Sequence, residues 1–219
     1  MRDRFMEQLT QLHQELTNMG MRCVEAISCA IRALTENERE LIAEAEQIER
    51  EIDGLESAIE SLCVKLLLQQ QPVAKDLRAI TSALKMISDL ERIGDQAADI
   101  AELTRRIIGR VNDSETHIKA MAVEAVKMVS DSIQSFVEGD ENAARAVIRQ
   151  DDVVDQYFMD IRDELVDLLK RHPDDSSYYL DLMMVAKYLE RIGDHAANVA
   201  EWVIYSVTGI RESSEHHYK

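Results

Sequence analysis

Hydrophobic residues recur at helical spacing along most of this chain. In the stretch from residue 41 to 66 they alternate in steps of four and three residues, the spacing of a coiled-coil seam: Leu41, Ala45, Ile48, Ile52, Leu55, Ile59, Leu62 and Leu66. A similar seam in the second half keeps Val154, Phe158, Ile161, Leu165 and Leu168. There Asp151 occupies a position where the seam would place an apolar residue. The pattern predicts long amphipathic helices.

Prolines, glycines and turn-forming polar residues divide this pattern into six segments. The predicted breaks are Glu36-Asn37, Pro72, Gly109, Asn112-Asp113-Ser114, Gly139-Asp140, Pro173 and Gly209. The first helix is expected over about residues 4–34, the second from about 41 to Pro72, and the third over about 76–108. The polar side chains of residues 112–114 are expected to cap the fourth helix.

The segment LERIGD occurs twice, at residues 90–95 and 189–194, followed by QAADIAE and HAANVAE respectively. Such a duplication indicates a structural repeat, and each half has the same order of two long helices, a proline and a motif helix. We therefore expect an all-α fold of two tandem pseudo-symmetric three-helix bundles, with six long helices in total. The expected units are residues 1–111 and 112–210, and residues 211–219 are expected to form a flexible tail.

The composition agrees with helices and limits the possible partners. Only two prolines and seven glycines are present, and 42 acidic against 25 basic residues give a formal net charge of -17. This charge repels nucleic acids and anionic lipids, and favours cations or basic protein surfaces. The start of the chain lacks an apolar signal segment, and no run of apolar residues is long enough to span a bilayer. The odd number of cysteines, without C-x-x-C spacing, suggests reduced core thiols of a cytoplasmic protein: Cys23, Cys29 and Cys63.

Acidic residues lie at four-residue spacing around the duplicated motif. On a helix, Glu91, Asp95, Asp99 and Glu102 fall on one stripe, and the second copy reads Glu190, Asp194, Asn198 and Glu201. The preceding helix of each half carries a further pair, Glu49/Asp53 and Asp151/Asp155. Stacked carboxylates repel one another unless a cation compensates. Oxygen-rich sites suit Mg²⁺, Mn²⁺, Ca²⁺ or iron, so the predicted metal ligands are Glu49, Asp53, Glu91, Asp95, Asp99, Asp151, Asp155, Glu190, Asp194 and Asn198.

The glycines, arginines and asparagine beside these carboxylates have expected roles of their own. Gly94 and Gly193 each cost helix stability, so we expect a second helix or a metal ion to approach the backbone there. Arg92 and Arg191 are interpreted as salt-bridge residues. The substitution of Asn198 for Asp99 predicts that the two sites are not equivalent. The alternative is that all these carboxylates form ordinary solvated faces.

No catalytic pattern accompanies the acidic residues. The Glu-x-x-His pairs of a di-iron oxidase are absent, as are a Walker loop, a G-x-S-x-G motif and a Cys/His nucleophile pairing. We therefore expect a protein that is not an enzyme.

With its two LERIGD-x-A-x-x-(I/V)-A-E strings and four E/D-x-x-x-D pairs, the chain resembles the PhoU family of phosphate-specific transport accessory and regulatory proteins. That resemblance implies bound metal ions, often iron or zinc, and homodimers. It also implies a cytoplasmic location, with peripheral association to membrane complexes. The implied partners are the ATPase subunit of the phosphate ABC transporter and a phosphate-sensing histidine kinase, and the implied role is to repress phosphate-starvation genes when phosphate is plentiful. The alternative function is a metal-independent acidic scaffold that binds basic partner surfaces.

Overall fold

A computed structural model describes residues 2–69, 72–110 and 117–211, and these ranges contain helices and no strand. The elements are α1 (Arg2–Glu36), α2 (Glu40–Gln69), α3 (Ala74–Ile107), α4 (Ile118–Glu138), α5 (Glu141–Arg171), the 3₁₀ helix η1 (Pro173–Asp175) and α6 (Ser176–Thr208). The predicted all-α class and the six long helices are confirmed.

The helices end where the sequence predicts breaks. Gly139 and Gly209 follow α4 and α6 in the left-handed conformation, with φ of 63° and 77°, which glycine adopts without steric cost. The Asp140 carboxylate caps α5 by accepting hydrogen bonds from the backbone N–H groups of Asn142 (2.8 Å) and Ala143 (3.1 Å). The predicted cap at residues 112–114 and the expected boundary at 111/112 lie outside the described residues, as do residues 212–219 of the expected tail.

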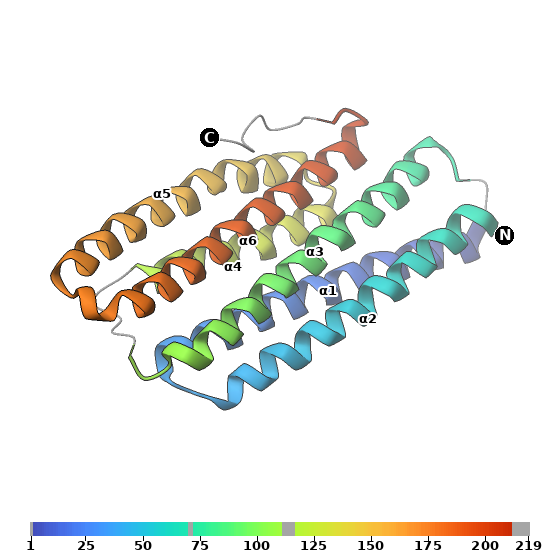
Figure 1. Cartoon of the computed structure of the whole chain (residues 1–219). Coiled ribbons are helices and arrows are strands. Elements are labelled where there is room, and N and C mark those ends of the chain that lie inside the picture. The colour runs from blue at the N-terminus through green and yellow to red at the C-terminus, as the bar shows by residue number, and fades with distance from the viewer. Residues whose placement is uncertain (1, 70–71, 111–116, 212–219) are drawn as a thin grey trace.

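Each half is a three-helix unit, and the two units lie side by side (Figure 1). The units meet through α3 against α6 and α1 against α4. By contrast, α2 packs only on α1 and α3, and α5 packs on α4, α6 and η1, so these two helices flank the molecule. The helices that carry the predicted pairs Glu49/Asp53 and Asp151/Asp155 therefore contact only helices of their own unit.

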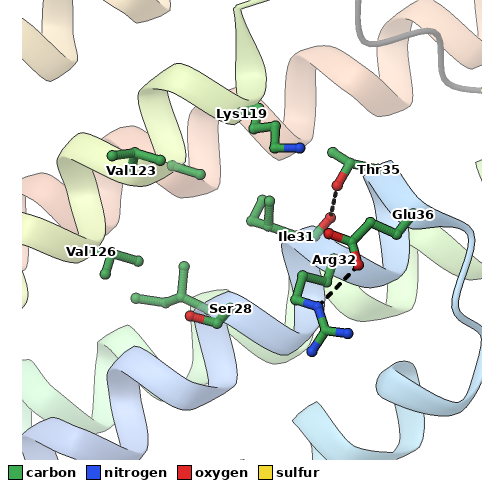
Figure 2. Close-up of a pocket in the computed structure, with 10 residues that line it drawn as sticks. Ser28, Ile31, Arg32, Thr35, Glu36, Lys119, Val123 and Val126 are labelled. Carbon is green, nitrogen blue, oxygen red and sulfur yellow. Dashed lines mark hydrogen bonds and ion pairs between the residues drawn. The ribbon is translucent and has the colours of Figure 1, made fainter.

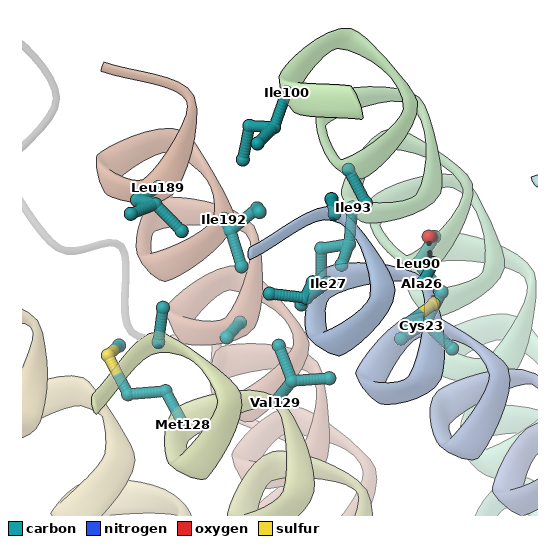
Figure 3. Close-up of a cluster of buried hydrophobic side chains, with 14 of the residues drawn as sticks. Cys23, Ala26, Ile27, Leu90, Ile93, Ile100, Met128, Val129, Leu189 and Ile192 are labelled. Carbon is teal, nitrogen blue, oxygen red and sulfur yellow. Dashed lines mark hydrogen bonds between the residues drawn. The ribbon is translucent and has the colours of Figure 1, made fainter. Parts of the chain in front are cut away.

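One continuous cluster of buried side chains runs through both units. Figure 3 shows its centre, where Ile27 of α1, Ile93 of α3, Val129 of α4 and Ile192 of α6 converge. The three cysteines are buried and free, as the sequence predicted, and burial raises the pKa of the Cys63 thiol to about 12. None of the described helices is long and apolar enough to cross a bilayer.

The seam between α1 and α4 is tight at one end and open at the other. A Cβ added at Gly20 would lie 2.5 Å from Cγ1 of Ile133, so glycine permits close helix approach there. Toward the other end of α4, a mainly apolar groove of about 260 Å³ opens between Ile31 of α1 and Val123 of α4 (Figure 2). Arg32, hydrogen-bonded to Glu36 at 3.1 Å, lies on its rim.

Candidate metal centre

Three of the predicted ligands converge between α2 and α3. One carboxylate oxygen each from Glu49, Asp53 and Asp95 lies within 4.8 Å of the others. Glu49 and Asp95 are half-buried, whereas Asp53 is exposed. These three residues are called the first cluster below. Three carboxylate oxygens at this spacing can ligate one cation from the solvent side.

Gly94 allows α2 and α3 to approach closely beside the first cluster. A Cβ at this position would lie 2.9 Å from Cδ1 and 3.3 Å from Cγ2 of Ile52. Ile52 lies on α2 between Glu49 and Asp53, so the packing of its side chain over Gly94 holds the acidic pair against α3. Of the two explanations the sequence allowed for this glycine, the structure supports close approach of a second helix.

Burial and repulsion by neighbouring carboxylates both act on Glu49 of the first cluster. Burial raises the pKa of Glu49, and the charges of Asp53 and Asp95 raise it further. Glu91 lies one turn from Asp95, and its pKa is raised by burial and then by the Asp95 charge. Arg92 contacts Asp95 at 3.1 Å and Glu91 at 3.5 Å, as its predicted salt-bridge role requires. A bound cation would favour the ionised forms of Glu49 and Glu91.

Glu56 is a further acidic neighbour that the sequence reasoning missed. Its pKa is raised by burial, then by the charges of Glu60 and Asp53, and a hydrogen bond with Ser88 opposes the shift. Glu56 lies seven residues after Glu49, so it occupies the same face of α2. That spacing was the available signal.

The second half places Asp151 and Asp155 of α5 opposite Glu190 and Asp194 of α6. Burial raises the pKa of Asp151 to about 7, with Asp194 and Asp155 the next largest causes. These four residues are called the second cluster. The Oδ1 atom of Asp151 is buried without a hydrogen-bond partner among the described residues. It lies 3.1 Å from the position of a Cβ at Gly193, so this glycine makes room for a carboxylate as well as for Val154.

A lysine already occupies the edge of the second cluster. Lys187 hydrogen-bonds to Glu190, and its ammonium lies 5.3 Å from the centroid of the Phe158 ring. Within residues 2–69, 72–110 and 117–211, only the first cluster has three acidic, histidine or cysteine ligand atoms close enough to share an ion. The two sites are therefore unequal in their geometry.

Asp99 and Asn198 lie at the contact between α3 and α6 rather than in either cluster. Asn198 donates a hydrogen bond to Asp89 at 3.2 Å, and His195 Nδ1 lies 3.0 Å from the same Asp89 oxygen. The pKa of Asp99 is raised by burial and then by Asp95, and the charge of Arg191 opposes the shift. Sequence reasoning missed Asp89, because a link between the two units has no local spacing signal.

Glu201, the last residue of the acidic stripe on the second motif helix, is buried. This side chain is only 7% exposed. The physical reason is that α6 packs against α3, α4 and α5, which leaves little of its surface to solvent. The stripe of the second copy therefore does not continue past Asn198 as an exposed face.

The donor set of the first cluster bears on which metal it fits. All three candidate ligands are carboxylates, which suit Mg²⁺, Mn²⁺, Ca²⁺ and iron. Zinc is most often held by cysteine sulfur or histidine nitrogen, and neither is part of this group. The chemistry of the site thus favours a hard cation.

Comparisons with known proteins match both halves of the chain. The PhoU domain family matches residues 16–104 and 118–203. The chain is 36% identical over 210 residues to the phosphate-specific transport system accessory protein PhoU homolog of Clostridium acetobutylicum, covering 94% of each chain. It is 35% identical over 215 residues to the Synechocystis protein of the same name, covering 96% of this chain and 94% of that one.

Solved structures agree with these sequence matches. The crystal structure of PhoU from Pseudomonas aeruginosa superposes with a TM-score of 0.88 at 32% identity, covering 94% of this chain and all of that one. The phosphate transport system regulatory protein PhoU from Streptococcus pneumoniae superposes with a TM-score of 0.86 at 27% identity, covering 96% of this chain and 100% of that one.

Proposed function

Because this chain belongs to the PhoU family, we propose that it is an accessory protein that regulates a phosphate-specific transport system. In this proposal it acts in the cytoplasm as a homodimer and is a regulator rather than an enzyme. It binds metal ions and links the ATPase subunit of the phosphate transporter to a phosphate-sensing histidine kinase. Its output is repression of phosphate uptake and of phosphate-starvation genes when phosphate is plentiful.

The convergence of Glu49, Asp53 and Asp95 is the observation that supports metal binding. Like charges at this spacing destabilise the folded protein unless protons or cations offset them, and the pKa of Glu49 is raised first by burial and then by the charges of Asp53 and Asp95. A hard divalent or trivalent cation would relieve the repulsion and fix α2 against α3. It would thereby present a defined surface to a partner protein.

Elemental analysis tests the metal part of the proposal. Protein purified without a histidine tag is expected to carry about one equivalent of iron, manganese or another hard cation per chain, bound at the first cluster. Combined Glu91→Ala and Asp95→Ala substitution should remove that metal. Metal-free protein after mild purification, with thermal stability unchanged by added Mn²⁺ or Fe³⁺, would rule it out.

An acidic scaffold that works without metal is the second candidate. It is favoured by the salt bridges of Arg92 to Asp95 and of Lys187 to Glu190, because basic side chains already compensate part of each cluster. On this alternative, arginine or lysine side chains of a partner would complete the compensation.

Pull-down with the transporter ATPase separates the two candidates. A metal-dependent adaptor should lose binding in the presence of a chelator and recover it when Mn²⁺ is restored. A scaffold should bind equally well with the chelator present, and its binding should instead weaken as salt screens the charges.

A further inference from the structure

We propose that a hollow at the start of α2 binds a tetrahedral oxyanion such as phosphate, through the guanidinium groups of Arg39 and Arg105. The hollow has a volume of about 200 Å³ and is lined by Arg39, Ile42, Ala43 and Arg105. Two guanidinium groups beside an apolar wall provide the planar, charge-assisted donors that oxyanions prefer. The inference stands apart from the proposed metal site, since no member of the first cluster lines this hollow.

The state of the nearby charges makes Arg39 the free donor of the pair. Within the described part of the chain, the guanidinium group of Arg39 has no hydrogen-bond or ion-pair partner. Glu38, its neighbour, is already bound by Arg32 at 3.0 Å. Arg105 is paired with Glu46. An anion that binds in the hollow would therefore have to compete with the Glu46 carboxylate for Arg105.

A hydrogen bond joins the two chain segments that lead to these arginines. Asn37 has a left-handed φ of 60°, the only non-glycine residue with a positive φ in the described ranges. Its side-chain oxygen accepts a hydrogen bond of 2.6 Å from the backbone N–H of Gly109. This bond joins the turn before Arg39 to the turn that follows α3. Arg105 lies in the last turn of α3. Because the backbone on both sides of the hollow is anchored, less backbone freedom is lost when the arginines bind an anion.

The second half carries no arginine at the positions that correspond to Arg39 and Arg105. The two family matches begin at residues 16 and 118 and end at 104 and 203. On that correspondence Glu141 replaces Arg39 and Ile204 replaces Arg105. In a protein with 42 acidic residues, two arginines that line one hollow are a specific feature, and the corresponding positions of the second half carry neither.

Glu46 connects the hollow to the first cluster. It pairs with Arg105 and also adds to the negative charge around Glu49. An oxyanion that replaces Glu46 on Arg105 would leave the Glu46 carboxylate uncompensated beside Glu49. A Glu46→Gln variant separates the effects, because it removes the competing charge and keeps the shape of the side chain.

Titration of the full chain with inorganic phosphate, in the presence of EDTA and followed by amide NMR shifts, tests the site without any metal. We expect saturable binding that Arg39→Ala and Arg105→Ala each weaken at least about tenfold, the scale of one charge-assisted hydrogen bond. Glu46→Gln should strengthen the binding. Arg50→Ala is the matched control, since Arg50 is an exposed arginine on α2 that hydrogen-bonds Gln47 and does not line the hollow, and it should leave the affinity unchanged.

A second titration with phosphoserine distinguishes the source of the oxyanion. Tighter binding of inorganic phosphate assigns the hollow to a free ion, and tighter binding of phosphoserine assigns it to a phosphoryl group carried by a protein; either outcome supports the site. Two results overturn it: no saturable binding of either probe, or equal weakening by Arg50→Ala and the two hollow variants, which would indicate an adventitious ion only. All four substitutions are at exposed or half-buried positions, and circular dichroism of each variant confirms that it is folded.

Discussion

The two halves of the chain place acidic residues at the same four positions on the same pairs of helices, yet they build different sites. In the first half, Glu49, Asp53 and Asp95 bring three oxygens together within reach of one ion. In the second half, Asp151 replaces Glu49, and its carboxyl oxygen lies buried over Gly193. A side chain shorter by one methylene keeps the carboxyl close to its own helix.

Residues outside the duplicated motif cause most of this difference. Where the first half has Ser88 and Glu56, the second has Lys187 and Phe158, whose side chains stack on each other. The first site therefore gains a carboxylate and the second gains an ammonium group. Two copies of the same motif can thus form one cluster that suits a bound cation and another in which a lysine side chain already supplies the positive charge.

Removing the carboxylates of one cluster at a time should have the largest effect. We expect Glu49→Gln, Asp53→Asn and Asp95→Asn combined to weaken Mn²⁺ binding by at least about a hundredfold, or about 2.7 kcal/mol, because the whole oxygen donor set is lost. The matching triple at Asp151, Asp155 and Asp194 should weaken it only a few-fold. Calorimetric titration of chelator-treated protein measures both.

Asp131→Asn, an exposed carboxylate on α4, provides the control for a general loss of negative charge. Equal losses in the two triple variants would show that the two halves bind metal alike, contrary to the difference expected between their clusters.

Asp151 should make the second half sensitive to pH. Its folded-state pKa of about 7 lies above the ordinary value of 3.8, so the folded protein keeps a proton that the unfolded chain releases between those pH values. Stability from this group is present below pH 4 and is lost as pH rises through 7. After allowance for solvent screening, Asp151→Asn should raise the free energy of unfolding by about 2 kcal/mol at pH 8.

Urea denaturation with EDTA at pH 4.5 and pH 8 checks this prediction. The gain from Asp151→Asn should fall to about a quarter of its pH 8 value at the lower pH, where the wild-type carboxyl is protonated in the folded state but largely ionised in the unfolded chain. Glu49→Gln, the equivalent change in the first half, should give a smaller gain at pH 8. A gain from Asp151→Asn that does not vary with pH would contradict the assignment.

Exchanging the residues beside the clusters should sharpen the comparison. Ser88→Lys adds an ammonium beside the first cluster and should lower its Mn²⁺ affinity about tenfold, or about 1.4 kcal/mol, by charge repulsion at partly screened distances. Lys187→Ser should raise the cation affinity of the second cluster by a similar factor. Calorimetry on each variant, with the other cluster neutralised, resolves the two sites.

Lys187→Arg keeps the charge and serves as the control. If Lys187→Ser left the second cluster unable to bind Mn²⁺, the geometry of Asp151 rather than the lysine would be the cause of the difference between the halves.

The helices could be read from the sequence because their signals are local. Apolar spacing predicted all six, and Gly139, Asp140 and Gly209 marked ends that the structure confirms. Glu49 and Asp53 lie at a distance before Pro72 that the second half repeats before its own proline. This correspondence predicted that α2 presents these carboxylates to α3. These features depend on residues within a few turns of one another.

The parts that could not be predicted depend on contacts between distant segments. Whether Glu201 is exposed or buried depends on α3, α4 and α5, which enclose α6. Asp89 receives hydrogen bonds from His195 and Asn198 across the two units. The role of Lys187 depends on its distance to Glu190 and Phe158, which helical spacing alone does not fix.

The smallest predicted effect concerns the two motif glycines. Alanine gains about 1 kcal/mol over glycine in a helix, but overpacking opposes that gain where the added Cβ meets a neighbour. At Gly94 the Cβ would lie 2.9 Å from Ile52, and we expect Gly94→Ala to lower the free energy of unfolding by about 1 kcal/mol. At Gly193 the nearest atoms are Asp151 Oδ1 at 3.1 Å and Val154 Cγ1 at 3.2 Å, so a smaller shift relieves the contact.

Gly193→Ala should therefore leave the free energy of unfolding within about 0.5 kcal/mol of the wild type. The added methyl group should also push the Asp151 carboxyl toward solvent, which flattens the pH dependence of stability that Asp151 causes. Gly54→Ala is the matched control, because this helical glycine has nothing within 4 Å of the added Cβ, and it should stabilise the protein by the full helix gain. Urea denaturation of the three variants ranks them as Gly54→Ala, Gly193→Ala, Gly94→Ala. The contrary result is that Gly193→Ala proves as destabilising as Gly94→Ala and leaves the pH dependence unchanged. That result would show that the Asp151 side chain packs against Gly193 as rigidly as the Ile52 side chain packs against Gly94. The second cluster would then be a packed structural element that cannot rearrange around a cation.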